Sequence, residues 1–483
     1  MGNNTNPNDN IARQPILPFP PVVAPLTFGR TMILTDVEEI TKDNLLRVLK
    51  KARGVFLKNK AECDSLYRYY RGEQPILNRV KFERPEINNM IVENRAFEIV
   101  TFKTGRFLYK DIQYTNRADD TVEEVNELNR MMVADDKAGK DMILVDWMHI
   151  AGHGYRLTLT SDNPDAPFHT YSVDPRRAFV VYSDTVEQEP VMGVYVTTKE
   201  DEKRRKHTIY TVYTKDMIYE VENDVVTEIG SHILGDVPLV EYPLNHARLG
   251  CFEVVLSILN AINSAQSNRL DGIEQFIQAL LVFKGLKMTD GDVAALKREG
   301  AICLPAGTDM DYLTKELNQS QAQTLVDDLY MAMLTICGMP NRNGGSSTSD
   351  NKGAVVLRDG WSAAATAVRG TKQYFASSER RMLAMVLKAF NTSRDAVLAL
   401  SEEKKNRKPL TTADIDIHFD EGEYENMLEK SQVFTTLVGS GWVDPRDAMA
   451  FSNITGDPDA AYIAGKKFHE EQQQVEITEL NNV

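Results

Sequence analysis

The residues best suited to chemistry form an alternating acidic segment late in the chain, Asp414-Ile415-Asp416-Ile417-His418-Phe419-Asp420. In a strand, alternation places Asp414, Asp416 and Asp420 on one face, where three carboxylates could hold the metal ion of a nuclease. The same alternation is typical of a half-buried strand that points its apolar residues into a core and its carboxylates into water. We favour the half-buried strand and keep a metal-dependent nuclease as the alternative hypothesis.

A second place to look for a metal is the pair His149 and His153, which one helical turn would bring together. The glutamate that follows the first histidine in zinc peptidases is replaced here by Ile150, so a structural role is favoured. Asp309 and Asp311 also alternate, with less support. The chain contains no phosphate-binding GxxxxGKS or GxxxxGKT loop, no GxGxxG and no GxSxG pattern. We therefore predict a protein that is not an enzyme and that needs no cofactor and no metal.

The composition is that of a folded protein without membrane segments. The 483 residues are 42% hydrophobic and 26% charged, enough for about two to four domains. Acidic residues outnumber basic ones 70 to 55, and a net charge of -15 disfavours a tight grip on nucleic-acid phosphates. The cysteines Cys63, Cys251, Cys303 and Cys337 lie far apart, which indicates a reducing compartment. The longest apolar run, Ala279–Phe283, is too short to span a bilayer, and the polar start is unlike a secretion signal.

The elements that must position these residues follow from the hydrophobic period. Helical patterns are predicted from near Asp36, capped by Asp36 or Thr41, and then over Lys60–Tyr70, Asn89–Tyr109 and Val122–His149. Between Tyr155 and Tyr242 a period of two predicts an antiparallel sheet with strands at Arg177–Tyr182, Val191–Thr197, His207–Tyr213 and Met217–Val221. The basic run Lys203–Lys206 follows three acidic residues and joins two strands, so we interpret it as a solvated hairpin tip.

A long helix is predicted over Cys251–Leu281, and its middle, Ser257–Asn268, carries no charge. A helix face that is neither apolar core nor charged surface favours packing against other copies of the chain. We expect these subunit contacts at Ser257, Asn260, Ala261, Ser264, Ala265 and Asn268.

The second half of the chain continues with alternating helices and irregular segments. A small α+β insertion over Lys284–Leu317 precedes a helix over Gln319–Cys337, which groups Leu325, Leu329, Met333 and Ile336 on one side. Gly338-Met339-Pro340 ends that helix, and a loop of Gly, Ser and Asn follows. A single helix is then predicted over Ala354–Asn391, and after the acidic strand come helices over Glu423–Val438, Asp444–Ser452 and Asp457–Gln474.

Several short segments, taken in order, resemble the portal proteins of tailed bacteriophages, in the branch found in siphophages of Gram-positive hosts. They are Tyr69-Tyr70-Arg71-Gly72, Ile87-Asn88-Asn89, Val92-Glu93-Asn94, Ile99–Gly105, Pro238–Tyr242, Gly338-Met339-Pro340-Asn341 and Gly441-Trp442-Val443-Asp444. No one of them is diagnostic, but their order along about 400 residues argues against coincidence.

The resemblance implies an α+β, ring-forming portal subunit with wing, stem, clip and crown regions and long helices flanking a flexible channel loop. The implied regions are a flexible arm (1–27), the wing (28–250), the first stem helix (251–282), the clip (283–318), the second stem helix (319–337), the tunnel loop (338–353), a long wing helix (354–409) and the crown (410–483). A capsid-associated scaffold without a channel is a further hypothesis.

The resemblance also implies a function. A ring, usually of twelve subunits, would form the channel at one capsid vertex through which double-stranded DNA is packaged and ejected. Its partners would be the terminase large subunit, the major capsid and scaffolding proteins and a head-completion adaptor, with assembly in the host cytoplasm and no membrane. We expect the channel loop to contact DNA through Asn341, Arg342, Asn343, Gly344, Gly345, Ser346, Ser347, Thr348, Ser349, Asn351 and Lys352. An acidic chain without a basic face suits a conduit, because few phosphate contacts would oppose sliding.

Overall fold

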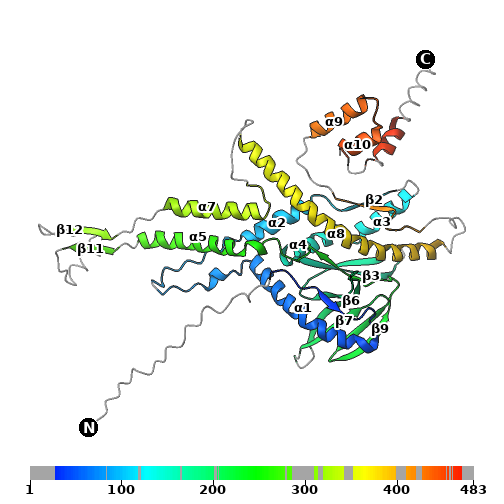
Figure 1. The fold of residues 1–483 in the computed structure, drawn as a ribbon, viewed down its shortest axis with the longest axis horizontal. Coiled ribbons are helices and arrows are strands. Elements are labelled where there is room, and N and C mark those ends of the chain that lie inside the picture. Colours follow the sequence, from blue (N-terminus) through cyan, green and yellow to red (C-terminus); the bar gives the residue numbers. More distant parts are fainter. Residues whose placement is uncertain are drawn as a thin grey trace, which may run out of the picture. The chain divides into compact units, whose positions relative to one another are not determined.

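A computed structural model describes residues 28–469, except for residues 83, 118–120, 164–165, 201–203, 205, 278–279, 285–308, 314–318, 342–351, 399–408, 420–426, 453, 456–457 and 459–460. The expected N-terminal arm, residues 1–27, lies outside the described residues. The described chain is divided into two compact units (Figure 1). The helix-pair unit contains residues 68–96 and 255–337, and the layered unit contains residues 28–67, 97–254 and 338–469.

Two sheets form the centre of the layered unit. The larger sheet has the order β1 (Ile33–Thr35), β5 (Ala178–Ser183), β6 (Pro190–Glu200), β7 (Lys206–Tyr213), β8 (Met217–Glu222) and β9 (Val225–Ser231). The smaller sheet has the order β10 (Leu239–Pro243), β3 (His153–Asn163) and β4 (Ala166–Val173). The predicted antiparallel strands are confirmed, and so is the hairpin that joins β6 to β7, in which Glu200 pairs with Lys206. Among the described strands of this sheet, β1 is the one that runs parallel to its neighbour, β5.

Helix α1 (Lys42–Tyr70) covers one face of the larger sheet. Its buried side chains Leu45, Leu49 and Phe56 share a core with the sheet, and the Phe56 ring stacks on Phe179 with centroids 4.6 Å apart. The two helices expected before Tyr70 are therefore one. The helix begins after Thr41, whose backbone N–H donates to the Asn44 side chain at 2.9 Å, so Thr41 and not Asp36 marks its start.

The predicted helix over Val122–His149 is two helices, α3 (Val122–Ala134) and α4 (Lys137–Ala151). The break falls at Asp136, whose φ of 51° cannot belong to a right-handed helix. α4 in turn ends at Gly152, whose φ is 80° and where a Cβ atom would lie 2.0 Å from the Arg248 carbonyl oxygen. Only glycine fits this turn, which directs the chain from α4 into β3.

The longest helix, α8 (Lys352–Leu398), has 47 residues and is about 70 Å long at 1.5 Å per residue. Its buried side chains Phe375, Met382, Val386 and Phe390 recur at helical spacing and form a second core with α3, α4 and the smaller sheet. Strands β2 (Gln113–Asn116) and β13 (Ile415–His418) pair antiparallel and close the same core.

Several shorter elements complete the described chain. In the layered unit these are α2 (Arg95–Phe107), α9 (Met427–Gly439), α10 (Pro445–Ser452) and a helical stretch over residues 461–469. The first two residues of α2, Arg95 and Ala96, belong to the helix-pair unit. In the helix-pair unit they are η1 (Pro75–Asn78), η3 (Glu253–Val255) at its boundary, α5 (Leu256–Ile277), β11 (Leu280–Lys284), β12 (Asp309–Leu313) and α7 (Gln319–Ile336). Cys63, Cys251 and Cys337 are free thiols. Within the described part of the chain, no helix combines the length and apolar character that crossing a membrane requires.

A closed cycle of four buried charges lies between α8 and the smaller sheet. Glu379 of α8 contacts the Lys137 ammonium at 2.8 Å and the Arg156 guanidinium at 3.4 Å. Asp141 contacts the same two cations, at 2.6 Å from the Lys137 ammonium, so the cycle has no net charge. Tyr114 and Tyr242 each donate a hydroxyl hydrogen bond of 2.6 Å to Glu379.

The charge of Glu379 is maintained by these partners. Burial on its own would raise the pKa of this carboxyl group, but Lys137 and Arg156 outweigh it and lower the pKa to about 2. Because the pKa in the folded state lies below the ordinary value of 4.5, the stabilisation is present above pH 4.5 and is lost as the pH falls toward 2.

We predict that Glu379→Gln destabilises the layered unit by about 3 to 5 kcal/mol, because one carboxylate fewer leaves an unbalanced positive charge in the core. Guanidinium denaturation followed by circular dichroism measures the change. Glu228→Gln, at an exposed position of β9, is the matched control and should change stability by less than about 0.5 kcal/mol. Equal stability of the two variants would contradict the central role of this charge cycle.

Candidate channel and subunit-contact site

One face of α5 is covered by the extended segment between Tyr69 and Asn94. The Tyr69 hydroxyl donates to the Asn260 side chain at 2.9 Å, and the backbone N–H groups of Glu93 and Ile91 donate to Asn263 at 2.8 Å and Ser267 at 3.0 Å. Alternate backbone N–H groups of the segment thus bind successive turns of α5. This explains why the predicted helix over Asn89–Tyr109 begins only at Arg95.

Asp271 anchors the far end of this segment. Its carboxylate accepts hydrogen bonds from the backbone N–H of Asn89 at 2.8 Å and from the Lys81 ammonium at 2.9 Å, and it pairs with Arg79 at 3.0 Å. Burial opposes ionisation, but these hydrogen bonds and the nearby cations outweigh it and lower the pKa of Asp271. The carboxylate is therefore ionised at neutral pH and fixes the segment to the helix.

The face of α5 beside this segment is a stripe of small side chains. Ser257, Ala261, Ser264 and Asn268 follow each other at intervals of four, three and four residues, with Ala265 next to them. Ser257, Ser264 and Asn268 are exposed, and the two alanines are half-buried. Two members of the predicted set contact the protomer's own segment: Asn260 accepts the Tyr69 hydrogen bond, and Asn268 accepts a hydrogen bond from the Arg79 guanidinium at 2.5 Å. That copies of the chain meet on this stripe stays a prediction.

The expected channel loop joins α7 to α8. Cys337 donates to the Met333 carbonyl oxygen at 2.9 Å, and Gly338 takes a left-handed φ of 61°, which ends the helix as predicted. Of the predicted loop residues, Asn341 is described, Lys352 is the first residue of α8, and Arg342–Asn351 lie outside the described residues.

The acidic segment is a half-buried strand, as favoured from the sequence. Ile415 of β13 is 4% exposed, and Ile417 and Phe419 pack against the same core. Asp416 is exposed and pairs with Arg117 at 3.0 Å, while Asp414 accepts hydrogen bonds from the Thr411 backbone N–H and hydroxyl at 2.9 and 2.6 Å. The third carboxylate, Asp420, lies outside the described residues, as do the side chains of Asp309 and Asp311 in β12.

The two histidines do not share a helix. His149 is in the last turn of α4, whereas His153 begins β3 on the other side of the Gly152 turn. Both are buried, and burial lowers the pKa of His149 to about 3 and that of His153 to about 4. They are neutral core residues at physiological pH. Among the described residues no group of three or more His, Cys, Asp and Glu side chains is placed to hold a metal ion.

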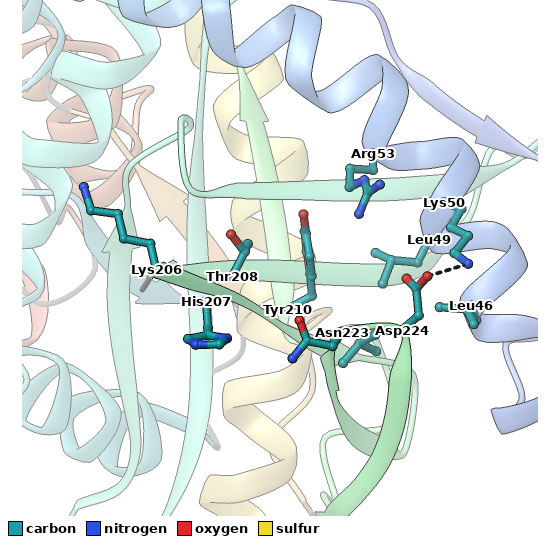
Figure 2. A pocket seen from close by; sticks show the side chains of 11 residues that line it. Leu46, Leu49, Lys50, Arg53, Lys206, His207, Thr208, Tyr210, Asn223 and Asp224 are labelled. Carbon is teal, nitrogen blue, oxygen red and sulfur yellow. Dashed lines mark ion pairs between the residues drawn. The ribbon is translucent and has the colours of Figure 1, made fainter. Parts of the chain in front are cut away.

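Two pockets of the layered unit are lined by charged side chains. One, of about 290 Å³, lies between α1 and β7 and is lined by Arg53, Lys206 and His207 together with the Lys50–Asp224 ion pair at 2.8 Å (Figure 2). The other, of about 440 Å³, lies between β2, α3 and the start of α4. It is lined by Lys137 and Asp141 of the buried charge cycle and by Tyr114, which donates a hydrogen bond to Glu379.

Comparison with known families identifies the protein class. Residues 50–477 match the family described as phage portal protein, SPP1 Gp6-like, and the chain belongs to this family. It is therefore a structural component of the phage particle that works as an oligomer, and not an enzyme. No curated protein matches the chain.

A solved structure is also similar. The match is a chain of the "Neck of empty GTA particle computed with C6 symmetry", with 12% identity over 82% of this chain and 94% of that chain and a TM-score of 0.42. That the chain comes from the branch of siphophages with Gram-positive hosts stays a prediction.

We predict that Asp271→Ala releases the segment Arg79–Glu93 from α5, because the cations Arg79 and Lys81 lose their shared carboxylate. Hydrogen exchange at the Asn89, Ile91 and Glu93 amides should become at least tenfold faster, and unfolding free energy should fall by about 2 to 3 kcal/mol. Ile273→Val, at an exposed position of the same helix outside the predicted subunit contacts, is the control. Unchanged protection of these amides in Asp271→Ala would show that the anchor lies elsewhere.

Proposed function

We propose that copies of this protein form a closed ring at one capsid vertex and that double-stranded DNA passes through the ring during packaging and ejection. The observation that supports the proposal most is the family match, which spans residues 50–477 and so includes both helices of the pair, the loop and α8. A ring of twelve subunits is the form we expect.

The helices and strands of the structure can be assigned to the proposed wing, stem, clip and crown of the ring subunit. Within the layered unit, the two sheets, α1 to α4 and α8 would be the wing, and α9 and α10 would be part of the crown. In the helix-pair unit, α5 and α7 would be the stem helices and β11 and β12 part of the clip. The proposed partners are the terminase large subunit, the major capsid and scaffolding proteins and a head-completion adaptor, with assembly in the host cytoplasm.

The charge of the chain and of its loop favours a weak contact with DNA. The chain has a net charge of -15, and the loop over residues 341–352 offers only Arg342 and Lys352 as cations. Few phosphate contacts release few counterions, so the affinity for DNA stays low and depends little on salt. Small hydroxyl side chains such as Ser346 and Ser347 can exchange contacts with passing phosphates. No observation favours the nuclease hypothesis over this function.

We predict that the purified protein is a single large oligomer and that Ala261→Glu weakens it. A carboxylate on the small-residue stripe would be desolvated and would face a second copy, which opposes association. Native mass spectrometry at micromolar concentration measures the oligomer. Ala413→Glu, at an exposed turn before β13, should leave the ring intact. A stable monomer of the unmodified protein would refute the proposed ring.

We predict that deleting Gly344–Ser349 leaves ring formation unchanged and abolishes DNA packaging or retention. The deletion removes glycines and hydroxyl side chains from the loop but leaves the two flanking helices. Negative-stain images measure ring formation, and protection of packaged DNA from added nuclease measures function. The control replaces Ser346 and Ser347 with alanine and keeps the loop length. Normal packaging by the deletion variant would place the DNA contact outside this loop.

A further inference from the structure

Helix α7 has an apolar side that the described part of its own protomer leaves uncovered. Val326, Met333 and Leu334 are buried, whereas Leu325 and Ile336 are each 54% exposed. Leu329 and Ala332, which are half-buried, complete a stripe at intervals of four, three and four residues. The sequence groups Met333 with Leu325, Leu329 and Ile336, but the structure turns Met333 inward and leaves the other three on the outer side. An apolar stripe of this kind on a soluble helix indicates a contact surface.

α5 and α7 run antiparallel, because the end of α5 and the start of α7 both lead into the β11–β12 pair (Figure 1). The small-residue stripe of α5, defined above by Ser257, Ala261, Ser264 and Asn268, has the same intervals as the α7 stripe. Because the intervals of four, three and four residues read the same in both directions, the two stripes can be aligned position by position when their helices are antiparallel. Neither stripe contains a charged residue.

We propose that the α7 stripe of one copy packs on the α5 stripe of the next copy around the ring. In antiparallel register the pairs are Leu325 with Asn268, Leu329 with Ser264, Ala332 with Ala261, and Ile336 with Ser257. Leu329 and Ile336 of α7 thus meet the small side chains of Ser264 and Ser257 on α5, an arrangement that lets two helices interlock at close distance. The proposal rests on the proposed ring.

A second copy of this chain is the occupant that the geometry favours. A closed ring needs two different, complementary surfaces on each subunit, because each copy contacts one neighbour with one side and the next neighbour with the other. The helix-pair unit supplies two such surfaces of equal length and spacing. Packing α5 on α5 of a neighbour would be an isologous contact, which pairs copies two by two and leaves the α7 stripe exposed.

Cysteine crosslinking tests this pairing on the full-length protein. The double variant Ser264→Cys with Leu329→Cys should form, on mild oxidation, a ladder of linked subunits on a non-reducing gel. Each single variant should run as unlinked protein, because its partner position lacks a thiol. The unmodified protein, with Cys63 and Cys337 buried and Cys251 half-buried, gives the background. Linked dimers of the Ser264→Cys single variant would show that α5 meets its own copy, and they would overturn the proposal.

A size swap keeps the proposal testable if the cysteines disturb assembly. Ser264→Leu alone overfills the contact and Leu329→Ala alone leaves a cavity, so each should raise the concentration needed for half-assembly by about tenfold. The two together should restore it to within about threefold. Intact rings that give no ladder and no recovery would overturn the pairing and leave the ring itself standing. Absence of rings in the unmodified protein would instead refute the proposed function.

Discussion

The buried charge cycle of Glu379, Lys137, Asp141 and Arg156 is the constraint on which the layered unit depends. Four charges can leave water only if each meets its opposite at short range, so the geometry admits one register of α8 against α4 and β3. The hydroxyls of Tyr114 and Tyr242 fill the remaining acceptor positions of Glu379 and include β2 and β10 in the same arrangement. Because α8 begins at Lys352, the helix that follows the proposed channel loop is held by this core.

In the helix-pair unit, hydrogen bonds fix an extended segment to α5, in addition to buried apolar side chains such as Ile262 and Met333. The segment that ends at Asn94 binds α5 through backbone N–H groups and through the carboxylate of Asp271. These contacts fix which face of α5 is occupied and therefore which face is left as a stripe of small residues. The adjoining α7 exposes Leu325 and Ile336. A subunit built in this way keeps its own fold and still presents two surfaces to its neighbours.

The sequence predicted the elements where the period was regular. The strands β5 to β8, the alternating β13 and the long α8 follow from the spacing of their apolar residues. It missed the break at Asp136, since a left-handed residue other than glycine leaves no mark on the hydrophobic period. It also missed Glu379, although a carboxylate on the same helix stripe as Phe375 and Met382 was a signal that this position is buried and paired.

By itself the sequence determined the class of the protein: an α+β chain without the phosphate loop or metal shell of an enzyme, with family-like segments in the family's order. These properties are local, because a motif or a helix repeat is written in neighbouring residues. Only the tertiary structure decided the roles of single side chains. Asn260 and Ser264 look alike in the sequence, yet the first binds Tyr69 and the second is exposed. That difference depends on a segment about 190 residues away along the chain, and contacts between distant segments are set by packing and not by local pattern.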